Sequence, residues 1–114
     1  MRSSREYNPN RWVILSFTDE KETWYKVFGS WSGGYLDGDS WRLSSGLDKI
    51  EEEGDYYLMR NHSGSTYKCH KQGTGMTGYT SAVFSSIVGQ AKDQGVKVEI
   101  VDIEKYLVDN PIQV

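Results

Sequence analysis

The 114-residue sequence is poor in cysteine, proline and histidine, with one, two and two residues. Cys69 alone cannot form an internal disulfide, so the chain lacks the disulfide framework of small secreted proteins. The sequence has thirteen basic and sixteen acidic residues, and the formal net charge of -3 provides no overall positive field to attract a nucleic acid. No apolar stretch approaches the roughly 18 residues that span a bilayer, and residues 1–10 are polar, unlike a signal sequence. These absences predict a cytoplasmic protein with no membrane partner and no support from its charge for binding nucleic acid.

Aromatic side chains, in contrast, are plentiful, with four Trp, eight Tyr and three Phe. They are spread from Tyr7 to Tyr106, and this distribution argues against disorder because a core can form along most of the chain. A chain of this length has room for one core but not for two. We predict a single domain over 12–108, a flexible N-terminal arm over 1–11 and a C-terminal tail over 109–114.

The first two thirds of the sequence reads as antiparallel strands. Residues 12–17 and 23–29 are dense in β-branched and aromatic side chains and flank a charged turn, a pattern that predicts a hairpin. Three further runs, at 47–53, 56–60 and 66–71, are separated by good turn sequences. We expect these three runs to form a meander.

Helical periodicity is confined to the C-terminal third. Apolar residues recur at spacings of three and four between Ala82 and Ala91, and Gly95 closes this segment. Alternation over 96–100 predicts a half-buried strand, and Asp102 can cap a short helical turn at 103–108. The predicted fold class is α+β: a mostly antiparallel sheet packed by one C-terminal helix, with a further strand after it. The alternative is a partly open small β-barrel with one helix.

The segment 30–41 concentrates glycine, serine and aspartate among aromatic residues, a composition typical of an irregular loop. Rigid aromatic rings beside small polar groups are typical of contact surfaces, since they offer area and hydrogen bonds at low entropic cost. The alternative is that Trp41, together with Trp24 and Phe28, fills the core of a small sheet protein. The candidate binding residues of this loop are Trp31, Tyr35, Asp37, Asp39 and Trp41.

The run Gly73–Gly78 matches the Gly-x-Gly-x-x-Gly pattern of dinucleotide-binding loops and lies between a predicted strand and the predicted helix. That chemistry needs a buried parallel strand before the glycines, whereas 66–71 is amphipathic. Too little chain follows Asp102 to complete a nucleotide-binding half. We therefore interpret the glycines as a connector or a helix entry, and predict no cofactor.

Cys69 and His70 pair a thiol with an imidazole in the sequence, and an adjacent base can activate a thiol. Adjacent residues of a strand point to opposite faces, so these two side chains cannot form a dyad. We expect Cys69 to pack with Tyr67 against the core. His62 in the preceding turn would still need a third, orienting group, and we predict no catalytic residue.

The sequence also contains fragments of metal-binding patterns. Asp37 and Asp39 resemble part of a calcium loop, but the remaining oxygen ligands and the late bidentate Glu are absent from the sequence. His62, Cys69 and His70 lack the paired spacing of zinc ligands. We therefore predict no metal.

Four segments resemble a group of small uncharacterised proteins of tailed phages and prophages. They are WYKVFGSWSGGY (24–35), GDSWRL (38–43), SG (45–46) and SGSTYKCHK (63–71). The resemblance covers roughly residues 12–78. It implies a bacterial or phage setting and no catalytic activity, because no function is attached to that group.

Together these patterns predict a non-enzymatic phage or prophage accessory protein that binds a host or phage protein through its 30–41 loop. One alternative is a small nucleotide- or metal-binding protein, or an enzyme, that uses the 73–78 glycine loop with His62, Cys69 or His70. The other is carbohydrate or single-stranded nucleic acid binding by stacking on aromatic rings.

Overall fold

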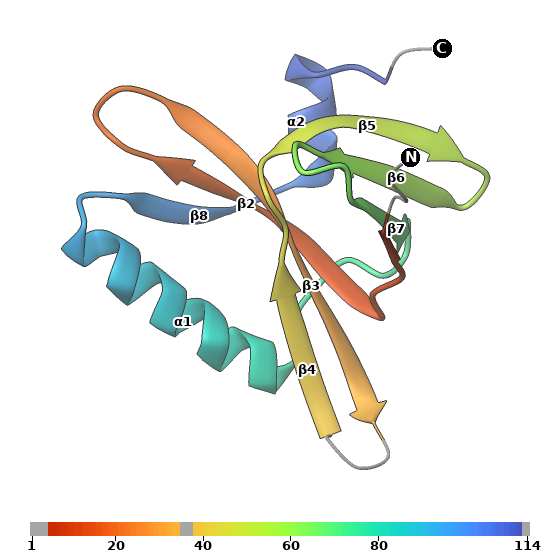
Figure 1. Cartoon of the computed structure of the whole chain (residues 1–114), viewed down its shortest axis with the longest axis horizontal. Helices are drawn as coiled ribbons and strands as arrows, with labels where there is room; N and C mark the ends of the chain where they lie inside the picture. The colour runs from red at the N-terminus through yellow and green to blue at the C-terminus, as the bar shows by residue number, and fades with distance from the viewer. Residues whose placement is uncertain (1–4, 35–37, 113–114) are drawn as a thin grey trace.

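The computed structural model describes residues 5–34 and 38–112 (Figure 1). Eight strands and two helices occur in these ranges. In chain order they are β1 (Glu6–Tyr7), β2 (Arg11–Thr18), β3 (Thr23–Gly34), β4 (Gly38–Leu43), β5 (Leu47–Glu53), β6 (Tyr56–Asn61), β7 (Thr66–His70), α1 (Gly78–Asp93), β8 (Lys97–Val101) and α2 (Ile103–Asp109).

The strands form two four-stranded sheets, ordered β4-β3-β2-β8 and β1-β7-β6-β5. Every pair is antiparallel except the two-residue pair of β1 with β7. The α+β class is therefore confirmed, as are the predicted hairpin (β2–β3) and meander (β5–β7). The two sheets do not close on each other, so the barrel alternative is wrong. The hairpin and the meander lie in different sheets, whereas the sequence predicted that they share one sheet.

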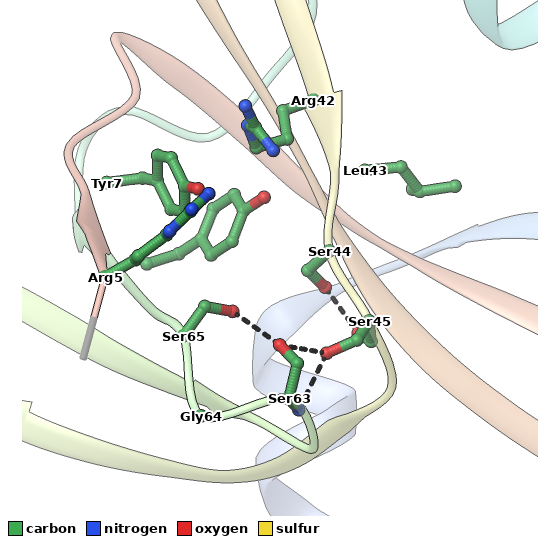
Figure 2. Close-up of a pocket in the computed structure, with 10 residues that line it drawn as sticks. Arg5, Tyr7, Arg42, Leu43, Ser44, Ser45, Ser63, Gly64 and Ser65 are labelled. Carbon is green, nitrogen blue, oxygen red and sulfur yellow. Dashed lines mark hydrogen bonds between the residues drawn. The ribbon is translucent and has the colours of Figure 1, made fainter. Parts of the chain in front are cut away.

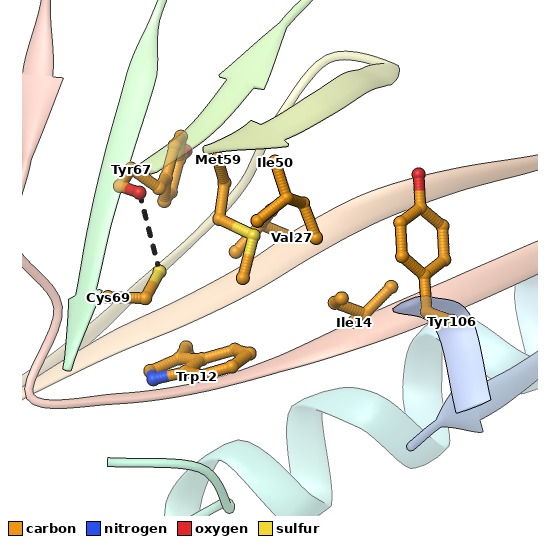
Figure 3. Close-up of a cluster of buried hydrophobic side chains, with 8 residues drawn as sticks. All are labelled: Trp12, Ile14, Val27, Ile50, Met59, Tyr67, Cys69 and Tyr106. Carbon is orange, nitrogen blue, oxygen red and sulfur yellow. Dashed lines mark hydrogen bonds between the residues drawn. The ribbon is translucent and has the colours of Figure 1, made fainter. Parts of the chain in front are cut away.

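Strand β2 lies at the centre of the molecule, with both of its faces buried. Trp12 and Ile14 pack between the two sheets, in a cluster that Figure 3 shows closed at one end by Tyr106 of α2. Val13 and Leu15 point the other way, into a second cluster beneath α1. The sheet β4-β3-β2-β8 is thus the middle of three layers, with α1 on one face and the second sheet on the other (Figure 1). A strand covered on both faces reads as a continuous apolar run, and residues 12–17 therefore show no alternation.

Local signals in the sequence set the ends of the helices. The Thr77 hydroxyl accepts from the Thr80 amide at 3.1 Å, the Thr80 hydroxyl accepts from the Thr77 amide at 2.8 Å, and this capping box begins α1. Gly95, at φ +78°, takes the left-handed conformation that follows the end of the helix. Asp102 caps α2 through the Glu104 amide, 3.0 Å away, as the sequence predicted.

Two segments that were expected to be irregular are regular instead. Glu6 and Tyr7, placed in a flexible arm, pair with Thr66 and Tyr67 of β7. The expected loop at 30–41 is largely β-structure, since β3 continues to Gly34 and β4 begins at Gly38. Pairing across the ribbon, Ser30 with Trp41 and Trp31 with Ser40, overrides the turn preference of the glycines. Because β2 pairs with β3 only as far as Ser30, residues 31–34 and 38–41 form a two-stranded extension, here called the β3–β4 arm.

Candidate functional site

Trp31 lies on the face of the β3–β4 arm that is braced by the N-terminal segment. Its ring meets Tyr7 edge to face at 6.3 Å between centroids, and its Nε1 donates to the Asn8 carbonyl at 3.0 Å. The Ser32 amide donates to Asn10 Oδ1 at 2.9 Å on the same segment. Trp31 is half-buried, and its one polar hydrogen is already bonded within the chain.

Trp41 lies on the opposite face of the arm, because it pairs with Ser30 whereas Trp31 pairs with Ser40. Its ring meets that of Phe28 edge to face at 5.7 Å between centroids, and 41% of the residue remains exposed. The two tryptophans therefore do not share one stacking surface. Of the other candidates, Asp39 belongs to β4, and Tyr35 and Asp37 lie outside the described residues.

Cys69 is an interior residue between the two sheets (Figure 3). It is 0% exposed, and its Sγ donates weakly to the Tyr67 carbonyl at 3.6 Å. Burial raises the pKa of the Cys69 thiol well above its ordinary value, because the thiolate would lose its hydration. The sequence predicted packing of Cys69 with Tyr67, and this is confirmed. The protonated thiol is not an activated nucleophile.

The two histidines do not complete a site with this thiol. His70 points away from Cys69, with its ring 5.0 Å from that of Tyr56, and its Nδ1 accepts from the Gln72 amide at 3.1 Å. His62 is exposed in the turn between β6 and β7. Among the side chains that the structure describes, no three from His, Cys, Asp or Glu are grouped to share a metal ion.

The Gly73–Gly78 segment is bound to strand β2 and does not form an open phosphate cradle. The Trp12 amide donates to the Gly73 carbonyl at 3.1 Å, and the Gly75 amide donates to the Trp12 carbonyl at 2.9 Å. A Cβ at Gly73 would lie 3.2 Å from the Asn10 carbonyl oxygen, a tight contact that favours glycine there. The segment leads into α1, which connects β7 to β8. These two strands lie in different sheets, whereas a dinucleotide fold places the two strands parallel in one sheet.

A polar pocket of about 520 Å³ opens where the base of the arm meets the β6–β7 turn (Figure 2). Among the residues that the structure describes, no acidic side chain lines it. The lining residues are Arg5, Tyr7, Arg42, Leu43, Ser44, Ser45, Ser63, Gly64, Ser65 and Tyr67. We call it the arginine–serine pocket.

One end of the pocket carries positive charge. The Arg42 guanidinium lies 4.6 Å from the centre of the Tyr7 ring, a cation–π contact that orients the side chain. Arg5 is held in place through its backbone, because its carbonyl accepts from the Thr66 amide at 2.8 Å. Tyr67 also lines the pocket, with its ring 5.0 Å from that of Tyr7, and burial raises the pKa of its phenol to about 12 despite the opposing charge of Arg42.

Three serine hydroxyls form a row at the other end (Figure 2). The Ser45 hydroxyl donates to Ser63 Oγ at 2.9 Å, and the hydroxyls of Ser63 and Ser65 are 3.2 Å apart. The Ser63 amide also donates to Ser45 Oγ, so the row is anchored to the backbone of the turn. Two hydrogen bonds within the row use two of the three hydroxyl hydrogens, and one hydrogen is left to donate elsewhere.

Sequence reasoning missed this pocket, because its members come from three separate segments, 5–7, 42–45 and 63–67. Arg5 belongs to the expected flexible arm, Arg42 lies in β4 directly after the expected 30–41 loop, and Ser45 follows β4. The one local signal is the serine-rich turn around Gly64, which on its own indicates a turn between two strands and no ligand.

No protein-family model, curated protein or solved structure matches this chain. In the described ranges, neither helix has the length and apolar composition needed to cross a membrane.

Proposed function

We propose that this chain is a non-enzymatic binding protein of a phage or prophage, and that it contacts a host or phage protein through the β3–β4 arm. The observation that carries the proposal is Trp41, 41% exposed on an edge strand. The phage setting comes from the resemblance of segments between residues 24 and 71 to phage proteins.

The arm offers two kinds of contact to another protein. The Trp41 ring is held by its edge-to-face contact with Phe28, so little conformational entropy is lost when its exposed part is covered. In the described part of the chain, β4 pairs only with β3, so its outer backbone groups are available to an added strand. A partner with an extended segment and an apolar side chain for Trp41 would use both features.

A site-specific crosslink identifies the partner and tests the proposal. A photoreactive residue at position 40 in the arm should trap a protein from bacterial lysate, whereas the same residue at position 108 on α2 should not. The trapped protein is then purified, and its Kd for the unmodified chain is measured. Trp41→Ala should weaken binding roughly 30-fold, as expected for an aromatic anchor worth about 2 kcal/mol.

Val108→Ala is the matched control, since Val108 is also a large apolar residue and is 77% exposed far from the arm. This control should leave Kd unchanged, and thermal unfolding should show that both variants remain folded. Equal crosslinking at positions 40 and 108, or an unchanged Kd for Trp41→Ala, would overturn the proposal.

A further inference from the structure

We propose that the arginine–serine pocket binds the phosphate group of a small phosphate monoester. This site is separate from the exposed face of the arm at Trp41 and does not depend on the proposed protein contact. The inference rests on two guanidinium groups and a row of hydroxyls that converge on one pocket (Figure 2).

The charge around the pocket favours an anion. Arg5 and Arg42 both line it, and neither forms an ion pair with any carboxylate among the side chains that the structure describes. Other basic side chains of the same region are already engaged: Arg60 pairs with Glu51 at 2.8 Å, and Lys68 pairs with Glu53 at 3.5 Å. The two pocket arginines thus provide positive charge in a molecule whose net charge is -3.

The geometry fits a tetrahedral dianion better than a carboxylate. A phosphate presents three acceptor oxygens in different directions, and planar guanidinium groups bind such oxygens in pairs. The serine row can donate from the other end, since the two hydrogen bonds within the row leave one of its three hydroxyl hydrogens for a ligand. A planar, singly charged carboxylate would use only part of this arrangement.

The size and the surroundings favour a small ligand over a polyanion. A volume of about 520 Å³ falls within the range of small-molecule sites, roughly 300 to 1,000 Å³. A nucleic acid would need further unpaired basic side chains along its path, whereas the nearby Arg60 and Lys68 are already paired with Glu51 and Glu53. The ligand class is therefore a phosphate group carried by a small organic molecule, or inorganic phosphate alone.

Titration calorimetry at low ionic strength tests this inference with three probes: inorganic phosphate, glycerol 3-phosphate and acetate. Both phosphates should bind and acetate should not, at matched ionic strength. Tighter binding of glycerol 3-phosphate would show that the pocket also contacts the ester, whereas equal affinities would show that it reads the phosphate group alone. Absence of phosphate binding at millimolar concentration, or equally tight binding of acetate, would overturn the inference.

Variants locate the binding within the pocket. Arg42→Gln and Ser63→Ala should each weaken phosphate binding, Arg42→Gln by about tenfold or more, because it removes a charged donor. Arg11→Gln is the charge-matched control, since Arg11 is an exposed arginine of β2 outside the pocket. Equal losses for Arg42→Gln and Arg11→Gln in folded protein would indicate a diffuse charge effect and refute the site.

Discussion

Truncating two adjacent residues of β2, Ile14 and Leu15, tests whether this strand lies between two cores. Both side chains are 0% exposed, but Ile14 faces the second sheet and Leu15 faces α1. Changing either to Ala removes about three carbon groups, worth about 2.4 kcal/mol in transfer alone at about 0.8 kcal/mol each. The cavity left behind adds to this loss, and the expected cost of each substitution is about 2–5 kcal/mol.

Urea unfolding, followed by tryptophan fluorescence and far-ultraviolet circular dichroism, measures these costs. Ile100→Ala is the matched control, because Ile100 is the same residue type on the neighbouring strand β8 but is 48% exposed. It should cost less than about 1 kcal/mol, in line with a partly solvated side chain. The two probes should give one transition with an unchanged m value, since the three layers share β2.

A sheet with only one covered face would give a different pattern, since neighbouring residues of a strand point to opposite sides. One of the two substitutions would then cost several kcal/mol and the other would behave like Ile100→Ala. A cost below about 1 kcal/mol for either Ile14→Ala or Leu15→Ala would refute the three-layer arrangement.

Two further predictions concern titratable groups between the sheets. Because burial raises the pKa of Tyr67 from 10.0 to about 12, the folded state favours the protonated phenol. Its contribution to the free energy of unfolding should be constant below pH 10 and be lost as the pH rises toward 12. The free energy of unfolding of Tyr67→Phe should therefore decline less at alkaline pH than that of the unmodified protein. An identical decline in both proteins would contradict the raised pKa of Tyr67. The Cys69 thiol, buried with a raised pKa, should not react with a thiol-specific reagent at pH 8 in the native protein and should react fully in guanidinium chloride; rapid labelling of the native protein would contradict its burial.

The elements of this protein follow from its sequence because their signals are local. The charged turn between β2 and β3, the recurrence of apolar residues in α1 and the cap at Asp102 each depend on residues within a few positions of one another. Packing of Cys69 with Tyr67 could also be predicted, because strand alternation places both on one face. Periods of two and 3.6 residues are properties of the backbone, so they can be read without knowing what lies across the fold.

The tertiary structure alone decided which strands share a sheet and where the polar side chains meet. Residues 31–34 and 38–41 have the composition of a loop, and only their pairing with each other makes them strands, since strand preference depends on the neighbours across the ladder. Arg5, Arg42 and Ser63 are far apart in the chain and carry no shared spacing. They converge because β1 pairs with β7 beside the base of the arm, a long-range contact that local periodicity does not encode.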